Sequence, residues 1–547
     1  MIRSPWKTSC VEPEKDRRAP PRPASLENRI RGLAVTPALW CITLVGLSMS
    51  PASAQEDTSG RDAWVPADQI GGLYEKECAV CHGGALEGTA QGPALTDSES
   101  SRPPDMDALS RQIAEGNPAQ GMPAWKDRFS PDRIRSLALY ILEKRARPRS
   151  ENDYGMGPLP DIPDERISSE EHDFRLKLRA EGIVHPYALA VLPDGTILFT
   201  ERTQGLRILS PTGRLSPPLR GTPRAYTDGV LRGYTYTGLG WVLDVAVHPE
   251  YSENGWIYLS HGDRCSDCNT LSRTNGEPVS MVALIRGRIR NGEWTDQQTL
   301  WKADRSTYSG GTELALGARI AFDDRGYVYL SVGAKGDYKR AQDLGWPDGK
   351  ILRLHDDGRI PADNPFIGTE GALPAIWTLG HRNPQGLEFD RHEALLWSSE
   401  HGPRGGDEGN VILGGRNYGW PRVSLGMEYD GSPIGGGQPH GLDPDSLEPP
   451  RIDWTPSLGV SGIDFHSGEA FPAWNHNLFL GTLSRNEVHR IEIKDGHAVH
   501  SEVLIRDLGR IRDLAVGPKG HIYLLIEHGQ GSRIVELEPF EATAPSR

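Results

Sequence analysis

Three residues near the N-terminus, Cys78, Cys81 and His82, have the types and the spacing of a covalent haem site. They lie in the stretch EKECAVCHGGALEG, where two cysteines separated by two residues are followed at once by a histidine. In this C-x-x-C-H order the two thiols form thioethers with the vinyl groups of a haem, and the imidazole binds the iron. We therefore expect the rest of the chain to produce or use electrons.

A second pair of cysteines, Cys265 and Cys268, lies in RCSDCN and has no histidine after it, so it is not a second haem site. Covalent haem attachment takes place outside the cytoplasm, where conditions are oxidising. This favours a local disulfide between the two cysteines. A redox or metal-binding role, with His261 nearby, is the alternative.

The first 54 residues are typical of an export signal. Arg29 and Arg31 precede the apolar run LAVTPALWCITLVGL, and the small residues PASAQ follow it, so we expect cleavage after Ala54 and a periplasmic protein. An uncleaved membrane anchor is the alternative, because the run is nearly long enough to span a bilayer.

The segment around the haem motif predicts a small helical domain. Apolar residues from Pro66 to Cys81 recur at intervals of three and four, which indicates a helix that brings both thiols to one edge of the haem. Residues 83–129 are rich in Gly, Pro and Asp and predict an irregular segment. A closing helix is expected from Ser130 as the N-cap, with Pro131 at its first position.

Residues 63–145 resemble a small class I cytochrome c in this order of helix, haem motif, loop and closing helix. In that family a methionine in a Pro-flanked loop before the last helix is the sixth iron ligand, and Met122 in GMPAW matches it. Met106 and Met156 are the rival candidates, but neither lies in such a loop. A thioether ligand raises the reduction potential of the haem, which suits an electron acceptor.

Composition and length indicate a second, larger and β-rich domain. The chain has 547 residues, of which 63 are Gly and 43 are Pro, and its formal net charge of −14 argues against a nucleic-acid partner. Residues 146–178 are Pro-rich and charged without sustained periodicity, so they predict a linker. The larger domain is expected over residues 179–541.

One pattern repeats six times in this larger domain: an apolar strand, a turn built from Pro, Asp or Gly, and a second β-rich strand. Further strand pairs lie between the repeats, as expected for six four-stranded sheets around an axis. The sequence thus predicts an all-β six-bladed β-propeller next to a small all-α cytochrome c domain. An irregular array of β-sandwiches is the alternative. The six hairpins are at 188–201, 244–261, 319–333, 386–402, 462–482 and 513–529.

The densest loop material lies in residues 379–421, where GHRNPQG, EHGPRGGDE and NYGWP follow one another. In this order and spacing the three motifs resemble the soluble aldose sugar dehydrogenases of the glucose/sorbosone dehydrogenase family. The resemblance extends over roughly residues 180–540. It implies pyrroloquinoline quinone (PQQ) and calcium as cofactors, in addition to haem c.

The resemblance also implies residues that bind PQQ. Arg510 and Arg512 in GRIRD stand where the family places arginines that bind the carboxylates of PQQ, and alternate positions of a strand point to one face. Arg382 and Asn383 match the pair beside the reactive carbonyl, which makes them the candidate catalytic residues.

Calcium ligands are implied in the same way. Gly402 and Pro403 match the residues whose main-chain oxygens hold the calcium of the cofactor, a cation that prefers oxygen ligands. Glu408 and Tyr418 fall where some members bind a second, structural calcium.

Three positions depart from the family pattern. The histidine that acts as general base is replaced by Ala315, a glutamine by Leu239, and a lysine that helps to hold PQQ by Ser484, which Arg485 follows. Loss of a general base slows such a reaction by about 10² to 10⁴. Glu313, His381 or His401 could replace it, and the sequence does not choose among them.

These patterns lead to a hypothesis about function. The propeller oxidises an aldose sugar or related alcohol with PQQ, the fused cytochrome receives the electrons, and a downstream acceptor, a soluble cytochrome or an oxidase, takes them from the haem. The alternative is a non-enzymatic ligand-binding propeller, similar to the hedgehog-interacting proteins, with a fused electron-transfer cytochrome.

Overall fold

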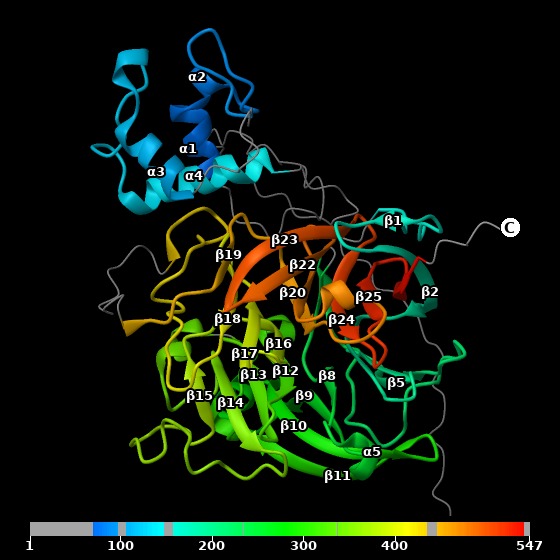
Figure 1. The fold of residues 1–547 in the computed structure, drawn as a ribbon. Coiled ribbons are helices and arrows are strands. Elements are labelled where there is room, and N and C mark those ends of the chain that lie inside the picture. The colour runs from blue at the N-terminus through cyan, green and yellow to red at the C-terminus, as the bar shows by residue number, and fades with distance from the viewer. Residues whose placement is uncertain are drawn as a thin grey trace, which may run out of the picture. The chain divides into compact units, whose positions relative to one another are not determined.

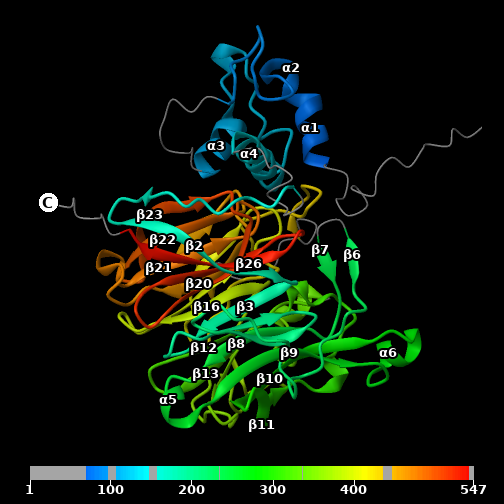
Figure 2. The same ribbon diagram turned by 90° about the vertical axis from the view of Figure 1, so that its right-hand side faces the viewer.

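The computed structural model describes residues 69–96, 106–146, 157–232, 235–335, 337–434 and 446–540 (Figures 1 and 2). The export signal expected at residues 1–54 lies outside them. Within these ranges, none of the helices combines the length and the apolar character needed to cross a membrane.

The haem motif lies in a helical domain, drawn in blue and cyan in Figure 1. Ser130 accepts a hydrogen bond from the main-chain nitrogen of Arg133 and caps the closing helix, as the sequence predicts. Apolar side chains of the helices form a common core, with Tyr74, Leu137 and Ala138 at its centre. The elements are α1 (Gln69–Glu77), α2 (Ala79–His82), α3 (Met106–Glu115), the 3₁₀ helix η1 (Pro118–Gln120) and α4 (Pro131–Arg145).

Two details of this domain differ from the sequence prediction. The first helix is divided at Cys78, so that Cys81 and His82 lie in the separate short helix α2. The stretch predicted to be irregular contains α3, whose buried residues Met106, Leu109 and Ile113 are spaced three and four apart. The Gly- and Pro-rich residues on both sides obscured this short periodic pattern.

The larger part of the chain forms sheets of three to five strands in its described residues, and all six predicted hairpins are present. The two-stranded β6 (Val230–Arg232) and β7 (Thr235–Thr237) and the helices α5 (Tyr251–Asn254) and α6 (Thr270–Asn275) are insertions. The first three blades are β3 (Pro186–Val191), β4 (Ile197–Glu201) and β5 (Gly205–Leu209); β8 (Val242–Val247), β9 (Ile257–Cys265), β10 (Val279–Arg290) and β11 (Glu293–Lys302); and β12 (Gly317–Phe322), β13 (Tyr327–Val332), β14 (Lys350–His355) and β15 (Ile376–Leu379).

The other three blades complete the ring. The inner strands β3, β8, β12, β16, β20 and β24 each contact the next, and β24 contacts β3 again, so the fold is a six-bladed β-propeller. The blades are β16 (Pro384–Asp390), β17 (Leu395–Glu400), β18 (Asp407–Val411) and β19 (Ile452–Trp454); β20 (Val460–Phe465), β21 (Asn477–Thr482), β22 (Glu487–Lys494) and β23 (His497–Arg506); and β24 (Arg510–Val516), β25 (Ile522–Glu527) and β26 (Ser532–Pro539), with β1 (Ile167–Ser168) and β2 (Asp173–Ile183).

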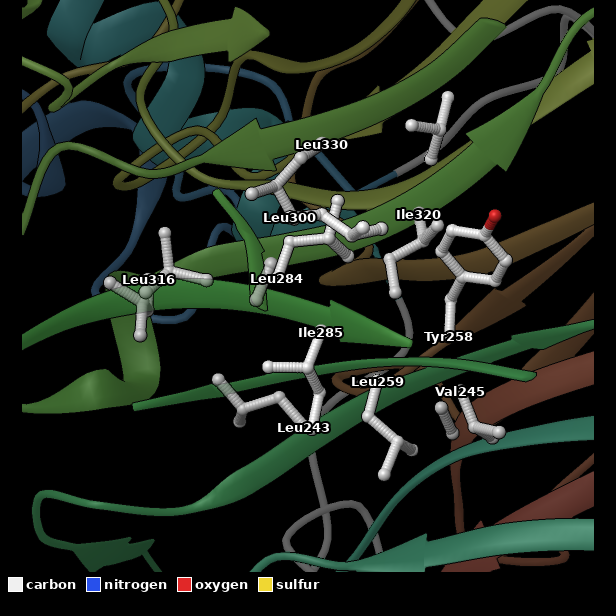
Figure 3. Close-up of a cluster of buried hydrophobic side chains, with 14 of the residues drawn as sticks. Leu243, Val245, Tyr258, Leu259, Leu284, Ile285, Leu300, Leu316, Ile320 and Leu330 are labelled. Carbon is white, nitrogen blue, oxygen red and sulfur yellow. The ribbon is translucent and has the colours of Figure 1, made fainter. Parts of the chain in front are cut away.

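Apolar side chains fill the space between neighbouring blades. Figure 3 shows one such cluster, in which Leu243 of β8, Leu259 of β9 and Leu284 of β10 meet Leu316 and Ile320 at the start of the next blade. Burial of these faces supplies the main driving force for stacking the blades. The loops at the start of each inner strand are thereby held at one end of the axis.

Cys265 and Cys268 form a disulfide at the end of β9, which confirms the local disulfide predicted from the sequence. The bond closes a short turn between β9 and β10. It therefore stabilises a loop and is not part of the haem site.

The ring is closed by a strand from the beginning of the propeller. β2 pairs with β26 in antiparallel register, and Figure 2 shows the two side by side. β1 and β2 begin inside residues 146–178, the stretch that the sequence predicts to be a linker. Phe174 and Leu176 of β2 are buried and alternate with exposed residues, so this part belongs to the propeller.

Glu536 of β26 joins the closing strands through a cluster of hydrogen bonds. Its carboxylate accepts from Arg179 of β2 at 2.6 Å, from His521 at 2.7 Å and from Tyr523 at 2.9 Å. Burial alone would raise its pKa, but the hydrogen bonds from His521, Arg179 and Tyr523 lower the pKa of Glu536 to about 2.

We expect Glu536→Gln to destabilise the propeller at pH 7 by up to about 3 kcal/mol. Because the pKa is lowered in the folded state, the stabilisation is complete above about pH 4.5 and is lost as the pH falls towards 2. Chemical denaturation at pH 7 and pH 3 should therefore show a large difference between variant and parent at pH 7 and a much smaller one at pH 3.

Glu538→Gln is the matched control on the same strand. Glu538 pairs with Arg175 and Lys177, whose side chains are about half exposed, so its loss should cost under about 1 kcal/mol. Equal costs of the two substitutions at pH 7 would contradict a special role for Glu536 in ring closure.

Candidate functional site

The haem motif has the geometry that covalent haem attachment requires. Cys78 precedes α2, while Cys81 and His82 lie within it, and neither thiol is in a disulfide. His82 Nδ1 lies 2.8 Å from the carbonyl oxygen of Pro93. A hydrogen bond there places the proton on Nδ1 and leaves Nε2 to bind iron, so these residues fit a haem.

Met122 lies in the loop between η1 and α4, where the sequence predicts the sixth iron ligand. Its main chain pairs with Asn117 in both directions, and its side chain packs against the helical core. Gly116 makes this loop possible, since a Cβ there would lie 2.2 Å from the carbonyl oxygen of Pro123. The rival Met106 is buried at the start of α3, and Met156 lies outside the described residues.

At the propeller, the charges of predicted cofactor residues from different blades act on one buried imidazole. His401 follows β17, whereas Arg510 and Arg512 belong to β24. Burial, followed by the positive charges of Arg382, Arg512 and Arg510, lowers the pKa of His401 to about 3. The charges of the three arginines that the sequence assigns to PQQ therefore all act on His401, and Arg382 also donates to its main-chain oxygen.

Arg510 and Arg512 share a single carboxylate, that of Glu527 on β25. Glu527 Oε2 accepts from Nε of Arg510 at 3.4 Å, and from Nε and a terminal nitrogen of Arg512 at 3.2 and 2.6 Å. The prediction that residues 510 and 512 share one face of a strand is therefore confirmed. Arg202, which the sequence analysis did not select, donates to the other oxygen of Glu527.

This cluster places three guanidinium groups around one carboxylate in a largely buried place. Arg202, Arg510 and Arg512 carry three positive charges, and Glu527 supplies one negative charge; the four side chains are 3%, 15%, 7% and 16% exposed. Buried charge is costly unless it is compensated. The donor set therefore fits a ligand with more than one carboxylate, as PQQ has.

Arg382 and Asn383 are neighbours in sequence but have different surroundings. Arg382 donates to the main-chain oxygens of His401 and Gly402 at 3.1 and 3.0 Å and to the hydroxyl of Tyr429 at 3.3 Å. Its guanidinium is thus directed at the loop that carries the predicted calcium ligands.

The Asn383 amide, in contrast, joins two blades. It donates to the carbonyl oxygen of Leu314 and accepts from the main chain of Gly317 and from Gln385. Only 4% of the residue is exposed. Asn383 therefore holds the loop that carries Arg382 against the preceding blade.

Gly402 and Pro403 lie in a tight loop between β17 and β18. A Cβ on Gly402 would lie 2.1 Å from the carbonyl oxygen of Gly405, so the loop needs glycine at this position. The fully buried Asp407 anchors it by accepting from the Gly402 nitrogen at 2.9 Å. Arg382 donates to the oxygen of Gly402, so in the structure this predicted calcium ligand has a positively charged hydrogen-bond donor, and the calcium site stays a prediction.

Glu408 and Tyr418, the predicted structural calcium site, have separate surroundings. Burial, followed by the negative charge of Glu400, raises the pKa of Glu408 to about 8. The Tyr418 hydroxyl is engaged with the main chain of Val411 and Leu413. In the part of the chain that the structure describes, no three His, Cys, Asp or Glu side chains are grouped to hold a metal ion.

Ala315 ends the short 3₁₀ helix η4 (Glu313–Ala315) and offers no side chain that could accept a proton. Of the candidate replacements, Glu313 accepts from the main chain of Gly240 and Trp241 and from Ser280.

The two histidine candidates differ. Both ring nitrogens of His381 are engaged, with Thr378 and Glu400. The buried Nε2 of His401 has no hydrogen-bond partner among the described residues.

The other two departures from the family pattern also lie in loops that precede or follow blade strands. The Leu239 oxygen lies 3.5 Å from Arg264, and the Ser484 nitrogen donates to the Leu458 oxygen. Arg485 is buried and lies near Glu487, whose pKa its charge helps to lower.

Comparison with known proteins gives matches over both parts of the chain. Residues 183–536 match the family described as Glucose / Sorbosone dehydrogenase, and residues 65–141 match the family described as Cytochrome C oxidase, cbb3-type, subunit III.

Individual relatives match the propeller over most of their length. Aldose sugar dehydrogenase YliI of Escherichia coli is 34% identical over 359 residues, which cover 65% of this chain and 90% of the relative. Quinoprotein glucose dehydrogenase B of Acinetobacter calcoaceticus is 25% identical over 448 residues, or 68% of this chain and 89% of the relative. The crystal structure of the soluble aldose sugar dehydrogenase of Escherichia coli in its apo-form has a TM-score of 0.58 at 31% identity, covering 67% of this chain and 100% of that one.

Proposed function

Because the chain belongs to the glucose/sorbosone dehydrogenase family and carries a cytochrome c domain, we propose that it is a periplasmic quinohaemoprotein. Its propeller oxidises an aldose sugar or a related alcohol with PQQ, and its haem c receives the electrons. The observation that carries the proposal is the cluster of Arg202, Arg510 and Arg512 around one carboxylate, which leaves a polycarboxylate site in a chain that also has a haem-binding motif.

In this proposal each part of the site has a separate task. Arg510 and Arg512 bind carboxylates of the cofactor, and the oxygens of Gly402 and Pro403 hold its calcium. PQQ, when bound, supplies a two-electron acceptor for the hydride of the substrate. Arg382 faces the same loop and stabilises negative charge that develops beside it.

The hydroxyl proton of the substrate leaves to a group other than residue 315, because Ala315 has no basic side chain. Glu313 and His381 already have their side-chain oxygens or nitrogens engaged. The Nε2 of His401 is the unpartnered nitrogen among these three candidates in the described structure, but a pKa of about 3 makes this ring a weak base, so no replacement base is assigned.

The cytochrome domain takes up the electrons one at a time and passes them to a downstream acceptor, a soluble cytochrome or an oxidase. His82 and Met122 are the proposed iron ligands, with Cys78 and Cys81 attached to the haem. The predicted export signal, the covalent haem motif and the disulfide between Cys265 and Cys268 together support the periplasm as the location.

A non-enzymatic ligand-binding propeller is the second candidate, and Ala315 favours it. Anaerobic absorption spectra of the exported, haem-loaded protein distinguish the two. With calcium, PQQ and a panel of aldoses and alcohols, we expect the haem to become reduced by at least one substrate. Omission of PQQ should leave it oxidised.

Two controls make this test specific. A Cys78→Ser, Cys81→Ser variant without attached haem should still reduce an added dye with the same substrate. If PQQ binds but no panel member reduces either haem or dye, the enzymatic proposal is contradicted and the ligand-binding propeller takes its place.

A further inference from the structure

Glu527 is the point at which the arginine cluster is held together. Its two oxygens have different partners: Oε1 accepts from Arg202, and Oε2 accepts from Arg510 and Arg512. The bonds to Arg510 and Arg512 involve their Nε atoms, so the carboxylate binds both guanidinium groups at the edge that carries Nε. A terminal nitrogen of Arg510 also donates to the Leu483 oxygen at 3.1 Å, and one terminal nitrogen of Arg512 donates to Glu527. The second terminal nitrogen of Arg512 takes no part in these bonds and can face a ligand.

Arg202 is the third member and comes from another blade. It follows β4, whereas Arg510 and Arg512 are on β24 and Glu527 ends β25. Its Nε lies 3.4 Å from the His185 oxygen, and its guanidinium lies 5.1 Å from the ring centre of Trp241. With 3% of the residue exposed, Arg202 is buried and contacts Glu527, the His185 oxygen and the Trp241 ring.

Charge explains why this arrangement is stable without a ligand. Burial alone would raise the pKa of Glu527, but Arg512, Arg202 and Arg510 hold it far below its usual range. The carboxylate therefore stays ionised at neutral pH and keeps neighbouring guanidinium groups from separating.

We propose that Arg202 and Glu527 form a positioning pair for the cofactor site: Arg202 fixes Glu527, and Glu527 fixes the side-by-side orientation of Arg510 and Arg512. This inference rests on the proposed function and adds two residues to the machinery that binds PQQ. Arg202 acts through Glu527 and not by direct contact with the cofactor. Its effect on affinity should therefore depend on the presence of Glu527.

The test is isothermal titration of the haem-loaded, calcium-containing full chain with PQQ. We expect Arg202→Gln to raise the dissociation constant at least about tenfold, because a charge is lost and Glu527 is no longer fixed. Arg202→Lys keeps the charge but not the planar guanidinium, so it should have an intermediate effect on the dissociation constant. It replaces Arg202→Gln in the test if that variant does not fold.

Arg353→Gln is the matched control. Like Arg202, Arg353 is 3% exposed, forms an ion pair with Asp363 and lies 4.0 Å from the ring centre of Trp377, but it belongs to β14, and its partners lie outside the arginine cluster. Its loss should lower thermal stability as Arg202→Gln does, and leave the dissociation constant of PQQ unchanged. If both variants weaken PQQ binding equally, the effect is a general one and the proposal is overturned.

A double-substitution cycle then separates positioning from direct contact. Glu527→Gln alone should also weaken PQQ binding, and adding Arg202→Gln to it should change the dissociation constant less than threefold. The positioning role would be overturned if the effects of the two substitutions on the dissociation constant of PQQ multiplied. It would also be overturned if Glu527→Gln bound PQQ more tightly than the parent. If the unaltered protein does not bind PQQ, the proposed function fails; if it binds and Arg202→Gln binds equally well, only this inference fails.

Discussion

Replacing Asp407 by alanine is expected to lower the free energy of unfolding of the propeller by at least about 3 kcal/mol and to abolish PQQ binding. Asp407 is fully buried at the start of β18. Its carboxylate accepts from the nitrogens of Gly402, Gly459 and Val460 at 2.9, 2.6 and 3.2 Å, and from the Ser457 hydroxyl at 2.5 Å.

The size of the effect follows from the number of donors that lose their partner together. Three main-chain N–H groups and one hydroxyl would face a small cavity, and each buried donor without an acceptor costs roughly 1–3 kcal/mol. These donors come from the loop of residues 401–406 and from the segment that leads into β20. Loss of Asp407 therefore releases the loop that carries Gly402 and Pro403 from the next blade.

Thermal unfolding and titration with calcium and PQQ measure the two consequences separately. Asp390→Ala is the control in the same blade, because Asp390 is 2% exposed and caps the turn after β16 by accepting from the His392 nitrogen at 2.8 Å. It should cost about 1–2 kcal/mol and leave PQQ affinity unchanged. An Asp407→Ala protein with normal PQQ affinity would contradict the anchoring role.

The strands were predictable where the signal is local. Each of the six hairpins has its apolar alternation and its turn residues within about 20 positions, and all six are present. β2 was not predicted because its partner β26 lies more than 350 residues further along the chain. The alternation of Phe174 and Leu176 with charged residues was its only local sign, and it follows a Pro-rich segment.

The candidate site shows the same division between local and distant information. Motif resemblance located Arg382, Arg510 and Arg512, whose charges all act on the buried His401 in the fold. Arg202 and Glu527 carry no motif of their own, and their role depends on the meeting of blades that are far apart in sequence. A buried arginine can be recognised only when its burial is known.

Arg382→Gln is expected to lower kcat by about 10² to 10³ while the fold is retained. Arg382 is the charged side chain that donates both to the oxygen of Gly402 and to the hydroxyl of Tyr429. Negative charge that develops next to it during hydride transfer would lose a preorganised donor, which glutamine cannot replace with a positive charge. Dye reduction under saturating PQQ and calcium measures this step without the haem.

Tyr429→Phe provides the comparison, because it removes one partner of Arg382 and keeps the guanidinium and its bonds to the oxygens of His401 and Gly402. It should cost less than about tenfold in kcat, since one exposed hydrogen bond is lost. If Arg382→Gln instead weakens PQQ binding and leaves kcat unchanged at saturation, Arg382 only supports the cofactor loop. A selective loss of kcat would place its charge beside the reacting atoms, because stabilisation confined to the transition state changes kcat and not the affinity for the cofactor.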